Sequence, residues 1–255
     1  MAPSPDDLWR VLGRAARIWA ADGLLRVEDD HWTAFSGQPS ASYNLACCRS
    51  SRAEVLVDGC LEPALGLKKP AIIMLAGAGL GTALHLVERG WVTVGALPLM
   101  VLDATSPWTA APADDTVVTT PLTFDEVPAA RELLTDCYDL DPATAAVAVP
   151  DRAADHDDQS VWGCYAEGRL VSCVTTVEED GLVVIWSMAT SREYQGRGYG
   201  RQMLDAVFTR GFADGATGSL LHSSVAGERL YRQLGFTVVE YLQLWSRPRW
   251  VLGAS

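Results

Sequence analysis

A loop rich in glycine and arginine carries the most distinctive chemistry of this sequence. It runs Gln195-Gly196-Arg197-Gly198-Tyr199-Gly200, after an apolar strand-like segment and at the start of a helix-like one. Glycine lets a backbone approach a ligand closely, and the first N–H groups of a helix lack internal partners and attract anions. Arg197 and Arg201 add positive charge beside those groups. The loop therefore predicts a binding site for a pyrophosphate, although a plain glycine-rich turn between a strand and a helix remains the alternative.

A second segment, Leu230-Tyr231-Arg232-Gln233-Leu234-Gly235-Phe236, follows a further strand and helix. The loop resembles the Q/R-x-x-G-x-G/A signature of the GCN5-related N-acetyltransferases, the GNAT superfamily, and the later segment resembles that family's second motif. The two occur in the family's order, and the resemblance covers roughly residues 116–248. It implies an acetyl-CoA cosubstrate and no metal.

The resemblance also implies roles for individual residues. In the family the strand before the loop splays from its neighbour, and its backbone pairs with the pantetheine arm as a further strand would. Tyr231 is expected near the sulfur, as the acid that protonates the departing thiolate; a core tyrosine beside Leu230 and Leu234 is the alternative. Ser224 is expected to hydrogen-bond the cofactor or to cap the following helix. Arg192 stands where the family often has proline. The expected cofactor-binding residues are Met188, Ala189, Thr190, Gln195, Gly196, Arg197, Gly198, Tyr199, Gly200, Arg201 and Ser224.

The general base is not evident from the sequence. An amine must lose a proton before it attacks a thioester, and Glu178, Glu179, Asp180 and Glu240 are expected on the substrate side, with solvated turn residues as the alternative for the first three. A bound water can also serve. The resemblance implies transfer of an acetyl group to the amine of a small molecule or peptide N-terminus by direct attack. The alternative is a CoA-binding or partner-binding module of the same fold without transfer.

Composition narrows the classes of protein and of partner. The 255 residues allow one large domain or two small ones, and 49 % are hydrophobic. A net charge of −12 disfavours nucleic acid, whose phosphates demand a basic surface. The apolar run Ala71–Leu84 is too short to span a bilayer, and the N-terminal residues do not resemble a secretory signal. Six cysteines without a C-x-x-C pair fit free thiols. We expect a cytoplasmic protein that needs neither nucleic acid nor membrane.

The order of elements predicts an α/β fold, with a mixed sheet covered by helices on both faces. Together with the family resemblance, this order of elements implies the acyl-CoA N-acyltransferase (GNAT) fold in a tandem arrangement. We expect a degenerate or partial copy at residues 1–104, a linker at 105–115 and the acetyltransferase domain at 116–255. A faint repeat at an offset of 145 residues supports the first copy, because Gly90-Trp91 falls on Gly235-Phe236. Chance similarity is the alternative. The chain is expected to be a monomer with pseudo-dimeric halves or a homodimer.

Two further motifs carry no functional prediction. Gly77–Gly81 lacks the third glycine of a dinucleotide-binding loop, and the acidic segment Asp155–Asp158 makes a poor metal site.

Periodicity and turn residues predict the positions of the helices and strands along the chain. Helices are predicted at 5–21, 51–65, 81–89, 124–138, 142–149, in the segment that follows the glycine loop, and at 226–234; strands are predicted at 31–35, 43–48, 71–75, 91–102, 116–122, 160–166, 170–177, 182–190, 219–222 and 236–245.

Overall fold

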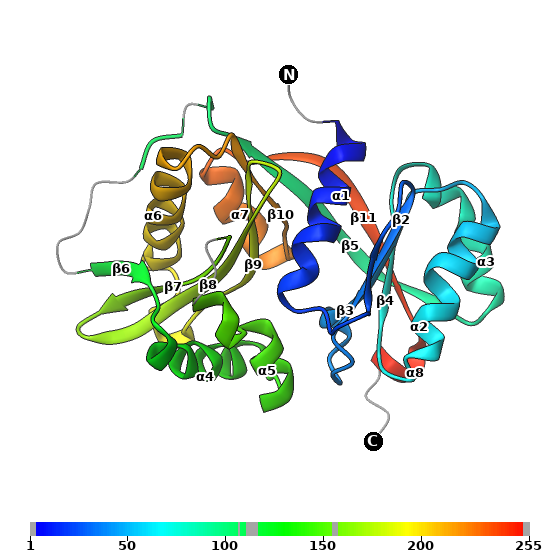
Figure 1. The fold of residues 1–255 in the computed structure, drawn as a ribbon, viewed down its shortest axis with the longest axis horizontal. Helices are drawn as coiled ribbons and strands as arrows, with labels where there is room; N and C mark the ends of the chain where they lie inside the picture. Colours follow the sequence, from blue (N-terminus) through cyan, green and yellow to red (C-terminus); the bar gives the residue numbers. More distant parts are fainter. Residues whose placement is uncertain (1–3, 107, 111–116, 155–157, 252–255) are drawn as a thin grey trace. The chain divides into compact units, whose positions relative to one another are not determined.

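The computed structural model describes residues 4–106, 108–110, 117–154 and 158–251. The chain divides into two compact units (Figure 1). The first comprises Met1–Met100, His222–Ala226 and Val238–Ser255, and the second comprises Val101–Leu221 and Gly227–Thr237. The predicted linker falls partly outside the described residues, as does most of the acidic segment Asp155–Asp158.

In the first unit the strands follow one another in the order β1-β2-β3-β4-β11-β5. From β1 to β11, neighbouring strands pair antiparallel except β3 and β4, which are parallel. Helix α1 begins with a capping box in which the Ser4 hydroxyl accepts a hydrogen bond from the Asp7 N–H, at 3.2 Å. The elements are α1 (Pro5–Ala15), η1 (Ala16–Ile18), β1 (Leu25–Val27), β2 (His31–Phe35), η2 (Ala41–Tyr43), β3 (Asn44–Cys48), the π-helix η3 (Val55–Leu61), α2 (Glu62–Gly66), β4 (Ile72–Leu75), η4 (Gly77–Thr82), α3 (Ala83–Glu88), β5 (Val92–Asp103), which ends in the second unit, β11 (Thr237–Ser246) and α8 (Pro248–Val251).

Helices cover both faces of this first sheet. Adjacent residues of a strand point to opposite faces, and two neighbours on β2 receive different helices. Trp32 lies against Gly13 of α1, while His31 lies against Gly59 of η3. A side chain at either glycine would enter the space of the ring it faces, so both helices sit close to the strand.

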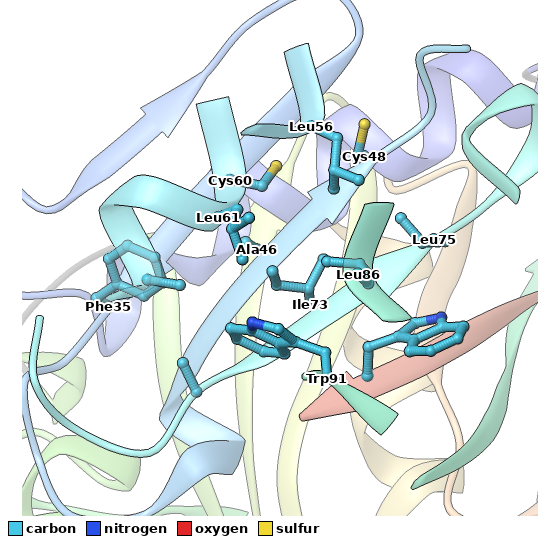
Figure 2. Packing of buried hydrophobic residues seen from close by; sticks show 13 residues of the cluster. Phe35, Ala46, Cys48, Leu56, Cys60, Leu61, Ile73, Leu75, Leu86 and Trp91 are labelled. Carbon is cyan, nitrogen blue, oxygen red and sulfur yellow. The ribbon is translucent and has the colours of Figure 1, made fainter. Parts of the chain in front are cut away.

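Below η3 and α2, a cluster of buried side chains forms the core of the first unit (Figure 2). Ile73 of β4 lies among Leu61, Leu86 and Trp91, and Trp245 of β11 joins the same cluster. Burial of such side chains contributes about 1.5–3 kcal/mol each. The last long strand of the chain is therefore part of the core of the first unit.

The second unit holds a sheet in the order β10-β9-β8-β7-β6. Strands β9 and β10 are parallel, and the other neighbours are antiparallel. Helix α6 covers one face, and α4 and α5 cover the other (Figure 1). The elements are β6 (Val117–Pro121), η5 (Phe124–Glu126), α4 (Val127–Tyr138), α5 (Pro142–Ala148), η6 (Asp151–Ala154), β7 (Gln159–Ala166), β8 (Arg169–Glu179), β9 (Leu182–Thr190), η7 (Arg192–Tyr194), α6 (Tyr199–Ala213), β10 (Gly218–His222) and α7 (Val225–Gln233).

The observed elements confirm the predicted α/β fold with mixed sheets. They also recur at the offset seen in the sequence, because Val92 and Thr237, the first residues of β5 and β11, are separated by 145 residues. The compact units differ from the predicted domain boundaries: residues 101–104 fall in the second unit, and His222–Ala226 and Val238–Ser255 fall in the first. Residues 238–255 were expected in the second domain, but β11 pairs with β4 and packs in the first unit.

Candidate active site

Strand β9 carries a β-bulge near its end. Cys173 of β8 pairs with Ala189, whereas Thr175 pairs with Trp186, so two residues of β9 oppose one of β8. Ser187, inside the bulge, has φ 47°. A non-glycine residue in this left-handed region costs of order 1–3 kcal/mol and is held there by its surroundings. Bulges often mark functional sites because they redirect a side chain and interrupt pairing.

The bulge turns Met188 toward helix α6. In a regular strand Val183 and Met188 would face opposite sides of the sheet. Here a side chain at Gly211 of α6 would meet Val183, and one at Gly200 would lie 2.9 Å from the Met188 Cε. These two glycines are about three helical turns apart and share one face of the helix. The bulge therefore lets both ends of β9 support α6.

Beyond the bulge, β9 has an edge that faces away from β8. The register between β9 and β10 covers Leu182–Val184 only, in the part of the chain that the structure describes. The Ser191 N–H donates to the Val171 carbonyl, and Ala189 pairs with Cys173. The backbone groups of the alternate residues Met188 and Thr190 consequently point away from β8.

This edge matches the splayed strand that the family resemblance implied, with one difference. The backbone groups of Met188 and Thr190 lie on the edge, but the Ala189 carbonyl accepts a hydrogen bond from the Ser172 hydroxyl at 2.7 Å. Ala189 therefore uses its backbone within the sheet. The Met188 and Thr190 carbonyls accept hydrogen bonds from Tyr138 and Gln195, so it is their N–H groups that this edge can offer to a ligand.

The glycine loop forms a turn that leaves its backbone open. Gly196 has φ 74°, and Gly198, the N-cap of α6, has φ 90°. Among the described residues, apart from the adjacent ones in the chain, no atom lies within 4 Å of where a Cβ would stand at either glycine. The first N–H groups of the 15-residue helix α6 thus open onto an accessible turn. This geometry fits a pyrophosphate, because the helix end supplies both donors and a positive dipole.

The side chains of Arg197, Gln195 and Tyr199 make different contacts around the loop. The exposed guanidinium of Arg197 lies over the Tyr194 ring, 5.3 Å from its centroid, at the mouth of the turn. The Gln195 amide nitrogen instead donates to the Thr190 carbonyl at 3.0 Å and so ties the loop to β9. Tyr199 is the first residue of α6, and its ring lies 5.8 Å from that of Tyr194.

Arg201 is held along the helix rather than at its end. Its Nε lies 3.6 Å from a carboxylate oxygen of Asp205, one turn later, and an Nη donates to the Thr109 carbonyl at 3.4 Å. The Trp108 indole N–H also donates to Asp205, at 3.0 Å. Arg201 is therefore engaged along the helix, whereas Arg197 lies over the Tyr194 ring at the loop.

Tyr231 of α7 reaches the bulge from the core. Its side chain is 7 % exposed, and its hydroxyl lies 3.3 Å from the Met188 sulfur. Burial, with a smaller contribution from Tyr138, raises the pKa of Tyr231 above its usual value. The phenol therefore keeps its proton at neutral pH, as a general acid must. Tyr231 is therefore a core residue whose hydroxyl also contacts the bulge, and its role as the acid stays a prediction.

A second phenol at the bulge was missed by sequence reasoning. Tyr138, the last residue of α4, donates its hydroxyl proton to the Met188 carbonyl. Burial of this hydroxyl raises the pKa of Tyr138 to about 12, although the side chain as a whole is 53 % exposed. Nothing in the sequence around Tyr138 signals the contact, because it depends on how α4 packs on β8 and β9.

The carboxylates of the β8–β9 hairpin, which were expected on the substrate side, lie far along the strand from Met188. Glu178 pairs with Val183, and Glu179 pairs with Leu182. Five residues of strand separate Val183 from Met188, which corresponds to about 16 Å. Burial, with help from Asp214 and Asp158, raises the pKa of Glu178 at this distant hairpin. Glu240 lies in the first unit and forms an ion pair with Arg49.

Ser224 and the Gly77–Gly81 segment are the remaining residues of interest. Ser224 is exposed and directly precedes α7, the position of a cap. In the Gly77–Gly81 segment, a side chain at Gly79 would collide with the Cys48 carbonyl, and one at Gly77 would lie 2.9 Å from the Arg49 guanidinium. These glycines are explained by close packing in the first unit.

All six cysteines are described and none forms a disulfide. Across the described ranges, no cluster of three or more histidine, cysteine, aspartate or glutamate residues could hold a metal ion. No described helix is both long enough and apolar enough to cross a membrane.

Solved structures with the same fold cover most of the chain. A GCN5-related N-acetyltransferase from Kribbella flavida aligns over 97 % of this chain and 97 % of its own, with a TM-score of 0.69 and 18 % identity. One from Sphaerobacter thermophilus covers 86 % of this chain and 76 % of its own, with a TM-score of 0.61 and 13 % identity. The GCN5-related glucosamine N-acetyltransferase region of a fungal multi-domain beta-N-acetylglucosaminidase covers 85 % of this chain and 31 % of that protein, with a TM-score of 0.61 and 11 % identity.

These likenesses show the fold. The match to the Kribbella flavida protein spans the first unit as well as the second, which is consistent with the tandem arrangement expected from the sequence. No curated protein matches the sequence. A family model for the acetyltransferase (GNAT) family matches residues 127–236, which include the bulge, the glycine loop and Tyr231. Residues 127–236 therefore form a domain of the acetyltransferase (GNAT) family.

Proposed function

We propose that this chain transfers an acetyl group from acetyl-CoA to an amine. One observation carries the proposal: Met188, at the bulge, lies against the start of the loop helix at Gly200 and also contacts the Tyr231 hydroxyl. The pyrophosphate would rest on the N–H groups that follow Gly198, beside Arg197. The pantetheine arm would run along the edge of β9 at Thr190 and Met188. This path brings the thioester to Tyr231.

The reaction we propose is a direct displacement. The amine nitrogen attacks the thioester carbonyl carbon, the new C–N bond forms, and the C–S bond breaks. In this proposal the Met188 N–H stabilises the negative charge that develops on the carbonyl oxygen. Tyr231 donates its proton to the departing thiolate. Alignment of the two substrates supplies much of the rate.

A water molecule is the base that this proposal favours, because the hairpin carboxylates lie about 16 Å along the strand from Met188. The acceptor is an amine of a small molecule or of a peptide N-terminus. A small-molecule amine draws support from the shared fold of the fungal region described as a glucosamine N-acetyltransferase. The negative charge of the chain suits a cationic acceptor.

The test is release of free thiol from acetyl-CoA across a panel of small amines and short peptides. We expect release that requires both the protein and an amine, with a product that has gained one acetyl group. The distant carboxylates also favour a second candidate, a CoA-binding module without transfer. Tight binding of CoA with no amine-dependent thiol release would support that module and reject the transferase.

A further inference from the structure

We propose that Tyr138 is a positioning residue of the reaction centre, which fixes the Met188 backbone through the hydrogen bond from its hydroxyl to the Met188 carbonyl. This inference rests on the proposed function and adds a residue to it. Tyr138 would affect the reaction by holding Met188 in place, whereas Tyr231 would act directly as the acid.

The bulge needs such a restraint. Ser187, directly before Met188, is in the left-handed region at φ 47°, and the regular ladder to β8 is interrupted there. A segment in this conformation stays ordered only when its surroundings hold it. In the described structure the Tyr138 hydroxyl holds the Met188 carbonyl, the Tyr231 hydroxyl lies 3.3 Å from the Met188 sulfur, and Gly200 makes room for the side-chain tip.

The same contact sets the direction of the neighbouring amide. In a strand, the N–H and C=O of one residue point to the same side. A donor that fixes the Met188 carbonyl on the free edge of β9 therefore also orients the Met188 N–H toward that edge. This is the N–H that the proposed reaction uses at the thioester oxygen.

Tyr138 is suited to this task by its place in the fold. It ends α4, and the next residue, Asp139, leaves the helix in the left-handed conformation at φ 54°. Helix α4 is anchored on the sheet by buried Ala130, Leu133 and Leu134. The phenol is consequently carried by a packed helix rather than by a loose loop.

The experiment uses the full chain and acetyl-CoA labelled with ¹³C at the acetyl carbonyl. A hydrogen bond from the Met188 N–H polarises this carbonyl and moves its ¹³C signal downfield on binding to the wild type. We expect Tyr138→Phe, which removes one hydroxyl, to move the signal back toward that of free acetyl-CoA. The affinity for CoA without the acetyl group, measured by calorimetry, should stay unchanged.

Tyr165→Phe is the matched control, because Tyr165 of β7 donates its hydroxyl proton to Glu126 at 2.9 Å rather than to the bulge. It should leave the downfield signal in place. If wild type binds acetyl-CoA but its carbonyl signal does not move, or if Tyr138→Phe leaves the shift unaltered, the positioning role is rejected while the proposed function survives. A Tyr138→Phe variant that loses affinity for CoA itself also rejects it. Wild type that binds neither compound rejects the proposed function.

Discussion

Met188 connects the separate parts of the candidate site at the scale of single residues. Its carbonyl meets Tyr138, its sulfur meets Tyr231, and its side-chain tip lies against Gly200. Sequence reasoning found Met188 and Tyr231 through the family motifs. It could not find Tyr138, because α4 carries no motif and the contact joins residues 50 positions apart.

Tyr231→Phe tests the acid role. We expect turnover to fall by about 10²–10⁴, the range for a general acid, while acetyl-CoA affinity changes little, because the ring and its packing remain. Steady-state kinetics with the best amine of the panel would measure kcat and KM. Tyr241→Phe, at an exposed position, is the control. Equal turnover in Tyr231→Phe and wild type would remove Tyr231 from the mechanism.

His222 predicts a pH dependence of stability. Burial lowers its pKa to about 4. Between that value and the unfolded value of about 6.5, the unfolded chain binds a proton that the folded chain excludes, so stability falls as the pH drops. The loss is at most about 3 kcal/mol. Urea unfolding at about pH 7.5 and about pH 5 should show a smaller difference for His222→Gln than for wild type. Identical pH dependence would contradict this assignment.

At the scale of elements, the sequence predicted nearly every helix and strand, because periodicity and turn residues act locally. The strand at Leu182–Thr190 appears with the bounds expected. The bulge within it was not predicted, because a bulge is a mismatch between two strands and depends on the register with β8. The distance of Glu178 and Glu179 from Met188 was not predicted either, because residues close in sequence can lie at opposite ends of an extended strand.

Gly198→Ala tests the loop that begins α6. A side chain at φ 90° is strained, so we expect a loss of about 1–2 kcal/mol in unfolding free energy, together with weaker CoA binding. Gly66→Ala is the control, since Gly66 ends α2 without positive φ and its Cβ would meet no non-adjacent described residue within 4 Å. Urea unfolding compares the two. Equal stability of Gly198→Ala and wild type would mean that the turn adopts another conformation.

At the scale of the whole molecule, one long strand belongs to a different unit than the sequence predicted. Strand β11 was assigned to the second domain, but it lies in the first unit. The repeat at 145 residues was visible in the sequence because it preserves the order of elements. The membership of β11 in the first unit was not visible, because Trp245 could pack with either set of strands and only its pairing with Ile73 decides.

Two fragments test this arrangement. A fragment of residues 116–255 carries β11 without its partner β4, which leaves Leu244 and Trp245 without their neighbours. We expect it to aggregate or to bind a hydrophobic dye. A fragment of residues 101–237 keeps the second unit and ends before most of β11, and it should expose less apolar surface. A soluble, dye-silent 116–255 fragment would contradict the assignment of β11 to the first unit.

The central claim is that the turn from Gln195 to Gly200 binds the pyrophosphate of CoA, and calorimetric titration with CoA tests it most directly. Wild type should bind one CoA per chain, and Arg197→Glu, an exposed charge reversal at the turn, should bind about tenfold more weakly or worse. Arg210→Glu changes the net charge equally near the other end of α6, about 18 Å along the helix from Gly198, and should bind as wild type does. Absence of binding by folded wild type, or equal weakening by both reversals, would contradict the claim.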